Sequence, residues 1–302
     1  MARQQAARRA LKVRCAIDGP PGAGKTFGAL LFARGLVGPE GKIGVIDTER
    51  GRCEQYGPMD ESDAGIAGIG RFVVDNLAPP FSPARYIKAI AESVEAGDDA
   101  LIIDSLSHAW AGTGGVLQQV NDAAGSNSFV KWAKPSAAHQ ALFDAIVQAP
   151  MHVICTMRSK MAYELTENDR GKKEPVRLGL APVQREGSEY EFDIVIDVDQ
   201  KTHRASLGKC NTSYAAMLAV ELEERPVITG ATGQAVARAI SGAPEPSAED
   251  KARQATRDFI HEHFAGDEFA IQREGFLTRL VGCVEVGNIR EVYRLAKAAS
   301  VR

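Results

Sequence analysis

The chain has 302 residues, with 36 Lys and Arg against 39 Asp and Glu and a formal net charge of −3 at pH 7. Its 44% hydrophobic content is ordinary for a globular protein, and the length allows one sizeable α/β core with a smaller appendage. The charge excludes a globally basic nucleic-acid-binding protein, although it leaves room for local basic loops.

Neither the apolar runs nor the cysteines indicate a membrane or secreted protein. No apolar run approaches the roughly 20 residues that cross a bilayer, and no apolar segment of a signal peptide follows the basic N-terminus. The five cysteines have no C-x-x-C spacing, which favours buried reduced thiols over a zinc site or a disulfide framework. We therefore expect a soluble protein of the cytoplasm that has no membrane partner.

Residues 1–14 are strongly basic and contain Arg3, Arg8, Arg9, Lys12 and Arg14. Such a segment is either a solvated chain end or a basic arm that contacts phosphates or a neighbouring subunit. The sequence leaves both interpretations open.

The next stretch fits the phosphate-binding pattern G-x-x-x-x-G-K-[ST] at every fixed position, with Gly19, Pro20, Pro21, Gly22, Ala23, Gly24, Lys25 and Thr26. Backbone N–H groups of such a loop turn towards one anion. Lys25 adds positive charge for the β- and γ-phosphates of ATP, and Thr26 offers a hydroxyl to Mg²⁺. An apolar strand at 13–17 precedes the loop and an apolar helical stretch at 29–37 follows it, as a true phosphate loop requires. The sequence therefore predicts a site for ATP and Mg²⁺.

Two carboxylates follow predicted strands downstream of the loop. The stretch 42–47 is an apolar strand with Glu49 just beyond it, and in open α/β sheets ligands bind at that edge. Glu49 is therefore our candidate for the residue that activates the attacking water, although Asp47 or Glu49 would serve equally well to start a turn. The stretch 100–105 is a second such strand, and its Asp104 fits the Walker B aspartate that holds Mg²⁺.

The remaining elements of the core follow from periodicity and capping residues. Apolar or alternating runs predict strands at 71–76, 151–157, 191–198 and 203–209, of which the last two form a hairpin. Helical spacing and caps predict helices that begin at Pro83 after Ser82 and that span 136–148 and 231–240. These elements predict an α/β fold with a mostly parallel central sheet flanked by helices.

Two segments have the composition of nucleic-acid-binding loops. Residues 110–134 are rich in Gly, Asn and Ser and end with the candidate contacts Phe129, Lys131, Trp132 and Lys134. In single-strand binding, rings stack on bases and cations follow the backbone, but an ordinary amphipathic segment has the same composition. Residues 161–190 are long and highly charged, and the candidates in and beside them are Lys160, Lys172, Lys173, Arg177 and Arg185. A solvated charged loop is the alternative there.

The composition changes near the C-terminus. Residues 242–248, rich in Pro, Gly and Ser, predict a linker. Residues 249–302 have three apolar helical faces and predict a small helical module. We expect 1–241 to form the ATPase core with its short basic N-terminal arm, and the module to bind DNA, another subunit or a different protein.

Several separated motifs between about residues 11 and 213 resemble a known family. Two of them are similar to the core of the RecA strand-exchange proteins: Ile46-Asp47-Thr48-Glu49 and Ile102-Ile103-Asp104-Ser105. Others resemble, more specifically, the phage-encoded RecA-like ATPases of the single-strand-annealing group: Pro79-Pro80-Phe81-Ser82-Pro83, Ile103-Asp104-Ser105-Leu106-Ser107-His108-Ala109-Trp110, Thr156-Met157-Arg158-Ser159-Lys160 and Ala181-Pro182-Val183-Gln184-Arg185-Glu186-Gly187.

This resemblance implies a RecA-like P-loop core that hydrolyses ATP on single-stranded DNA during phage recombination, as a filament or ring of identical subunits. It implies that Glu49 is the catalytic base and that 111–134 and 160–187 correspond to two DNA-binding loops. Lys209 has the position from which RecA sends lysines into a neighbour's ATP, and Tyr56 has that of an adenine-stacking tyrosine.

The chain also departs from the RecA pattern. RecA carries a glutamine that senses the nucleotide at the end of the strand that here holds Thr156, and no glutamine stands at that place. Thr156 and Arg158 remain as candidate sensors. The predicted C-terminal module does not resemble the RecA C-terminal domain.

We therefore predict a P-loop ATPase that binds Mg²⁺-ATP through Lys25, Thr26 and Asp104 and that anneals single-stranded DNA or promotes strand exchange. The alternative is an ATP-dependent loader or regulatory ATPase that contacts a phage or host replication or recombination protein through its C-terminal helices. A small-molecule P-loop kinase fits less well, because the sequence has no compact arginine-bearing lid.

Overall fold

The computed structural model describes residues 12–60, 63, 65–66, 68–123, 128–167, 173–210, 215–241, 252, 256, 259–260, 263–264, 270–281 and 286–300. The chain divides into two compact units, 1–242 and 243–302, and each is described by itself. The predicted linker 242–248 and residues 1–11 of the predicted basic arm lie outside the described residues.

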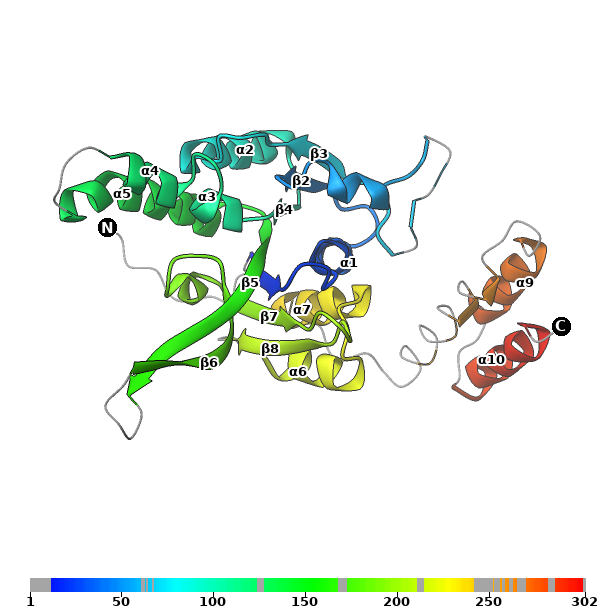
Figure 1. The fold of residues 1–302 in the computed structure, drawn as a ribbon. Helices are drawn as coiled ribbons and strands as arrows, with labels where there is room; N and C mark the ends of the chain where they lie inside the picture. The colour runs from blue at the N-terminus through cyan, green and yellow to red at the C-terminus, as the bar shows by residue number, and fades with distance from the viewer. Residues whose placement is uncertain are drawn as a thin grey trace, which may run out of the picture. The chain divides into compact units, whose positions relative to one another are not determined.

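The first unit is built on an eight-stranded sheet of order β3-β2-β4-β5-β1-β7-β8, with β6 paired to β5 beside this path (Figure 1). Neighbouring strands run parallel, except that β8 is antiparallel to β7 and β6 to β5. The strands are β1 (Arg14–Gly19), β2 (Ile43–Asp47), β3 (Val73–Asn76), β4 (Ala100–Asp104), β5 (His152–Glu167), β6 (Lys173–Pro182), β7 (Ile194–Val198) and β8 (Ala205–Cys210). The predicted α/β fold with a mostly parallel sheet is therefore confirmed, and so is the predicted hairpin, which β7 and β8 form.

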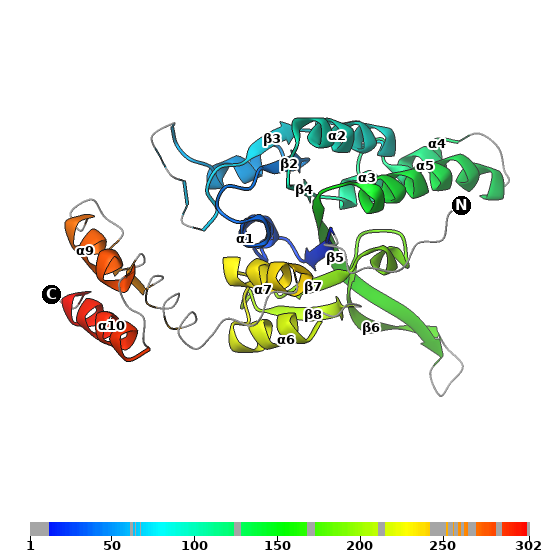
Figure 2. The same ribbon diagram turned by 180° about the vertical axis from the view of Figure 1, so that it is seen from behind.

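Helices cover both faces of the sheet (Figures 1 and 2). One face packs against α1 (Lys25–Val37), α6 (Ala215–Glu224) and α7 (Gly230–Ser241), and the other against α2 (Pro83–Ala96) and α5 (Ser128–Gln148). Successive β1 residues alternate between the two cores, because Cys15 and Ile17 lie in the first and Ala16 in the second. Strands buried on both faces explain the continuous apolar runs of the sequence.

The helix that was predicted to begin at Pro83 does begin there, but Ser82 at its N-cap position makes no side-chain cap hydrogen bond. Ser82 has extended backbone (φ −73°, ψ 145°), and Pro83 begins α2, where a missing N–H leaves no hydrogen bond unmade. Gly97 ends the same helix with φ 73°, a left-handed conformation in which its N–H bonds back to the last turn.

Residues 110–134 contain more helix than predicted. α3 (Ser107–Ala111) and α4 (Val116–Asp122) occupy the first part, and α5 begins at Ser128 instead of residue 136. The prediction took Pro135 as a boundary, because proline removes a helical hydrogen bond. In the structure Pro135 stays inside α5 and is buried, so that its packing compensates for the missing bond.

The segment 161–190, predicted as a long charged loop, is mostly strand. β5 continues to Glu167 and pairs with β6 from Ser159 opposite Pro182 to Glu167 opposite Lys173. We call residues 159–167 and 173–182 the β5–β6 arm, which extends beyond the sheet in Figures 1 and 2. Apolar residues recur at every second position along 161–165. This period of two indicates a strand, and it proved more informative than the charge, which had favoured a loop.

Two further features differ from the prediction. No element was predicted where α6 lies, although Leu218 and Leu222 supply a buried face at the spacing of one helical turn. Arg14, which was counted both in the basic N-terminal segment and in the predicted strand 13–17, belongs to the strand and is only 6% exposed within β1. Its guanidinium donates to the carbonyl oxygens of Met151 (2.9 Å) and Val147 (2.7 Å), which explains how a buried cation is accommodated.

The second unit contains α9 (Ala270–Val281) and α10 (Val286–Ser300) among its described residues. Side chains of both helices pack with two side chains from earlier in this unit in a small apolar cluster. Its members are Ile260, Phe264, Leu280, Ile289, Val292 and Ala296. The predicted first helix of this region falls partly outside the described residues. In the parts of the chain that the structure describes, no helix combines the length and apolar character needed to cross a membrane.

Candidate nucleotide site

The phosphate loop joins β1 to α1 at the carboxyl edge of the sheet. Gly22 and Gly24 have φ of 79° and 88°, conformations that favour glycine. The ammonium of Lys25 lies on the loop itself, where Nζ donates to the carbonyl oxygens of Gly19 (2.8 Å) and Pro20 (2.9 Å). Burial lowers the pKa of Lys25. A desolvated ammonium that donates to two carbonyl oxygens gains a stronger partner when a phosphate enters the loop.

The turn between β7 and β8 contacts the phosphate loop. Gln200 Nε2 donates to the carbonyl oxygen of Pro21 (2.8 Å), and His203 Nδ1 lies 3.1 Å from the carbonyl oxygen of Ala23. The sequence analysis did not identify these two residues. Because β1 and β7 are paired and parallel, their carboxyl ends lie at the same edge of the sheet, and this brings the turn after β7 next to the phosphate loop.

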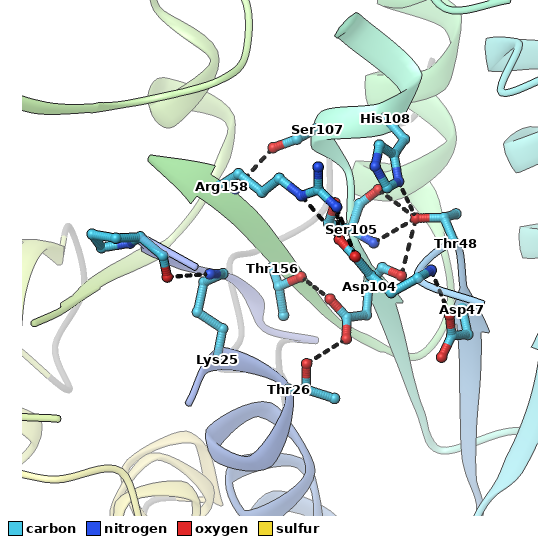
Figure 3. Close-up of polar contacts among 12 residues, drawn as sticks. Lys25, Thr26, Asp47, Thr48, Asp104, Ser105, Ser107, His108, Thr156 and Arg158 are labelled. Carbon is cyan, nitrogen blue, oxygen red and sulfur yellow. Dashed lines mark hydrogen bonds and ion pairs between the residues drawn. The ribbon is translucent and has the colours of Figure 1, made fainter. Parts of the chain in front are cut away.

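Asp104, at the end of β4, connects the loop to the sheet and is 2% exposed. Its carboxylate accepts hydrogen bonds from Thr26 Oγ1 at Oδ2 (2.6 Å) and from Thr156 Oγ1 at Oδ1 (Figure 3). Burial raises the pKa of Asp104, and the two hydroxyl groups act against that shift. A divalent cation beside Asp104 and Thr26 would favour the charged carboxylate. These two oxygens therefore fit Mg²⁺, which takes few protein ligands together with phosphate oxygens and waters.

The two acidic residues at the end of β2 have different contacts. Both oxygens of the Asp47 carboxylate accept backbone N–H groups, Oδ1 from Glu49 (2.5 Å) and Oδ2 from Cys53 (3.1 Å). Asp47 therefore shapes the turn into the 3-10 helix η1 (Arg52–Tyr56). The carboxylate of Glu49 takes no part in that turn. The sequence left open whether Asp47 or Glu49 only starts a turn, and in the structure the turn contacts are those of Asp47.

Glu49 forms an ion pair with Arg158. The guanidinium donates to Oε1 from Nε (3.0 Å) and Nη2 (2.6 Å), and Nη2 also lies 2.7 Å from Oε2. The side chains of Arg158 and Glu49 are 42% and 16% exposed. In the sheet register, Arg158 on β5 lies opposite Gly19, the first residue of the phosphate loop. Arg158 thus brings a second cation close to the loop.

Thr48 connects the ends of β2 and β4. Its Oγ1 accepts the N–H of Ser105 (2.8 Å), lies 3.1 Å from the carbonyl oxygen of Asp104, and contacts His108 Nδ1 at 2.7 Å (Figure 3). These contacts keep Glu49, the next residue, in a fixed position relative to Asp104. Thr48 and His108 lie within motifs of the sequence, but no pattern there predicts a role for either residue.

A cavity of about 1110 Å³ lies beside the Glu49–Arg158 pair. Both side chains line it, together with Arg52 and Glu54 of η1, residues at the end of β3, and His108. Lys25 and Thr26 are not among its lining residues. The ion pair therefore has open space next to it on the side of η1 and β3.

Two predicted nucleotide contacts lie elsewhere in this unit. Nζ of Lys209 donates to the carbonyl oxygens of Glu189 (3.0 Å), Tyr190 (3.0 Å) and Phe192 (2.9 Å). These contacts occupy the ammonium within its own chain and give no support to a role in a neighbour's site, which stays a prediction. The ring of Tyr56 packs on that of Phe27 (5.3 Å between centroids), two residues after Lys25, and its contact with adenine also stays a prediction.

The predicted nucleic-acid contacts lie on a helix and on the β5–β6 arm. The first turns of α5 carry Phe129, Lys131, Trp132 and Lys134. Phe129 is 89% exposed, and the ring of Trp132 lies 6.0 Å from that of Trp110. Lys160 and Arg185 are exposed at the base of the arm. Lys173 and Arg177 belong to β6, whereas Lys172 lies outside the described residues.

Gln184 links these two regions to the nucleotide site. Its Nε2 donates to the carbonyl oxygen of Leu106 (3.3 Å), and its Oε1 lies 2.9 Å from His139 Nε2 on α5. The ring of His139 packs on Trp110 (5.1 Å). A hydrogen-bonded chain thus connects α5, the base of the arm and the segment after Asp104.

Asp18 lies directly before the phosphate loop and is 4% exposed. Its Oδ1 is buried with no hydrogen-bond partner among the described residues, and Asp197 on β7 is its neighbour in register. Burial and then Asp197 raise the pKa of Asp18 to about 8, against the opposing effect of Lys25. The folded protein therefore keeps a neutral carboxyl group under the phosphate loop near neutral pH.

This raised pKa predicts a pH dependence of stability. Because the pKa is higher in the folded protein than the ordinary 3.8, the stability that this carboxyl contributes is fully present below about pH 4 and is lost as the pH rises towards about 8. We expect Asp18→Asn, which stays neutral, to gain stability relative to the wild type over this window in urea denaturation. Asp197→Asn should lower the upper end of this window, because Asp197 contributes to the raised pKa of Asp18 in the folded protein. Parallel pH curves for the wild type and Asp18→Asn would contradict the assignment.

Comparisons with known proteins identify one matching family and several similar solved structures. The family model described as AAA domain matches residues 11–238. Two similar solved structures are the RadB recombinase (19% identity, TM-score 0.38, 66% of this chain and 81% of that chain) and a KaiC-like protein from the hyperthermophilic archaeon Pyrococcus horikoshii (16%, 0.36, 66% and 79%). Likenesses at these TM-scores carry no assignment of function. No match was found among curated proteins.

The phosphate loop, the Asp104–Thr26 contact and the mostly parallel sheet all lie within the matched range. Since that range covers well over half of the chain, the protein belongs to the AAA domain family and is, in general terms, a P-loop ATPase.

Proposed function

We propose that this protein hydrolyses Mg²⁺-ATP and acts on single-stranded DNA in phage recombination, by annealing or strand exchange, as a homo-oligomeric filament or ring in the host cytoplasm. The observation that carries the ATPase part is the meeting of two strand-end carboxylates beside one phosphate loop. Asp104 is hydrogen-bonded to Thr26 of the loop, and Glu49 is held next to Asp104 through Thr48.

In this proposal the phosphate loop binds the triphosphate of ATP. Lys25 leaves the carbonyl oxygens of Gly19 and Pro20 and contacts the β- and γ-phosphates, since an anionic oxygen is a stronger partner than a carbonyl. Thr26 and Asp104 hold Mg²⁺, which, when bound, neutralises charge on the same phosphates.

Glu49 accepts a proton from the water that attacks the γ-phosphate. Among the described acids at the ends of β2 and β4, Glu49 is the one whose carboxylate accepts neither a backbone N–H nor a threonine hydroxyl, because Asp47 accepts two N–H groups and Asp104 two hydroxyl groups. A general base must lie within hydrogen-bond reach of the water, and Glu49 sits on the wall of the adjacent cavity. This favours hydrolysis over transfer to a small acceptor.

The DNA part of the proposal rests on α5 and its connection to the site. Exposed rings and lysines share the first turns of α5, and the chain Trp110–His139–Gln184–Leu106 leads from there to the segment after Asp104. A strand stacked on Trp132 has a physical route to the ATPase centre. The alternative remains a loader or regulatory ATPase that works through a partner protein bound to its C-terminal helices, with little contact to DNA.

The test is ATP hydrolysis with and without a single-stranded oligonucleotide over a range of salt concentrations. We expect stimulation that fades with salt, because phosphate contacts release counterions. Lys131→Ala with Lys134→Ala should weaken oligonucleotide binding and lower the salt slope by about 0.7 for each lost phosphate contact. Lys88→Ala on α2, an exposed lysine paired with Glu92, is the matched control. Hydrolysis that ignores DNA would support the loader instead.

A further inference from the structure

The ion pair between Arg158 and Glu49 restricts the residue that we propose as the base. Both oxygens of the Glu49 carboxylate are within hydrogen-bond distance of the guanidinium, with contacts of 2.6–3.0 Å. The Glu49 side chain is 16% exposed, and Arg158 covers it. A water molecule must therefore compete with a charged donor for the same oxygens.

Arg158 has a second anion-binding position within reach. On β5 it lies opposite Gly19 in register, so that its side chain starts beside the phosphate loop. Lys25 and Arg158 are close enough for the charge of Arg158 to contribute to the lowered pKa of Lys25, after burial. Each cation already has a partner in the structure, carbonyl oxygens for Lys25 and Glu49 for Arg158.

The surroundings allow the pair to separate. The Arg158 side chain is 42% exposed, and the pair borders a cavity of about 1110 Å³, so that the guanidinium is not enclosed by the core. The backbone of Arg158 is fixed meanwhile, because its N–H donates to Ser107 Oγ (2.9 Å) and its carbonyl oxygen accepts the N–H of Val183 (2.6 Å). Only the side chain has to move.

We infer that Arg158 exchanges the Glu49 carboxylate for the terminal phosphate of ATP, so that a triphosphate releases the base and a diphosphate leaves it paired. A guanidinium binds phosphate oxygens in the same two-pronged geometry that it uses for a carboxylate. This inference rests on the proposed ATPase function and adds a regulation of that site: the residue that recognises the γ-phosphate is the one that blocks Glu49 in its absence.

A double-mutant cycle in nucleotide binding tests the exchange without relying on activity. The full chain is titrated with ADP and with the imido analogue of ATP, which is not hydrolysed. Glu49→Gln removes the charge that competes for Arg158, and we expect it to tighten analogue binding about 3- to 10-fold while ADP binding stays unchanged. Arg158→Ala should weaken analogue binding about 10-fold and leave ADP unchanged.

The double variant decides between exchange and simple repulsion. If Arg158 mediates the effect, Glu49→Gln brings no tightening in the Arg158→Ala background. If the tightening persists there, Glu49 merely repels the γ-phosphate and the exchange is wrong. If the Arg158→Ala variant unfolds, the cycle is repeated with Arg158→Gln, which keeps a polar side chain. Arg52→Ala, which removes another arginine that lines the same cavity, is the control. A wild-type protein that binds neither nucleotide overturns the proposed function and this inference together.

Discussion

Lys25→Ala is expected to lose ATP hydrolysis by about 10²- to 10³-fold, because it removes the charge aimed at the β- and γ-phosphates. Lys25 is the cation of the phosphate loop, and its Nζ already lies 2.8–2.9 Å from two loop carbonyl oxygens. Binding of the ATP analogue should weaken about 10- to 100-fold, the value of a charge-assisted contact. Phosphate release and fluorescence titration measure the two effects.

A matched control separates phosphate binding from loss of a surface charge. Lys42 is exposed at the amino end of β2, at the edge of the sheet opposite the phosphate loop, and Lys42→Ala should hydrolyse ATP at the wild-type rate. Circular dichroism checks that both variants fold. A Lys25→Ala protein that hydrolyses ATP normally would remove the basis for placing nucleotide in this loop.

The phosphate loop and the strand-end acids were predictable because their signals are local. The spacing of Gly19, Gly24 and Lys25 specifies the loop, and an apolar run before Asp104 specifies a buried parallel strand whose carboxyl end meets that loop. The contact between Asp104 and Thr26 then follows from topology. For the same reason the parallel sheet could be derived before any contact was known.

The partners of the acids were not predictable in this way. Asp47 and Glu49 are equivalent in sequence, and only the backbone path into η1 gives Asp47 the two N–H groups that occupy it. Arg158 was one of two candidate sensors, but its pairing with Glu49 joins residues 109 positions apart. Such a contact depends on side-chain direction at the ends of β2 and β5, which no local pattern encodes.

The predicted DNA loops show how local rules compete with tertiary packing. Gly, Asn and Ser near residues 112–128 and Pro135 argued for a loop, yet burial of Pro135 on α5 extends the helix. In the β5–β6 arm, the high charge favoured a loop, whereas the alternation of apolar residues favoured a strand. The structure has paired strands there, as the alternation indicates. Seven of the candidate contacts therefore sit on regular elements, four on α5, Lys160 on β5, and Lys173 and Arg177 on β6, whereas Arg185 follows β6 outside any helix or strand.

Glu49→Gln is expected to bind ATP and to hydrolyse it about 10²- to 10⁴-fold more slowly, since it removes the proposed general base without changing its shape. Thr48, Asp104 and Thr26 keep their contacts, so the triphosphate and its cation are still held. Single-turnover phosphate release isolates the chemical step, and titration with the ATP analogue shows that binding is retained. A loss confined to the rate of hydrolysis is the signature of a group that acts on the attacking water.

Glu54→Gln supplies the matched control, because Glu54 lines the same cavity on η1 and accepts a hydrogen bond from Asn76 (2.7 Å) away from the phosphate loop. It removes an equal charge from the same wall and should leave the rate within about twofold of the wild type, as surface substitutions usually do. If Glu49→Gln and Glu54→Gln behave alike, the cavity charge and not a specific base controls the reaction. If Glu49→Gln hydrolyses ATP at the wild-type rate, another group activates the water, and the ion pair with Arg158 has no part in gating it.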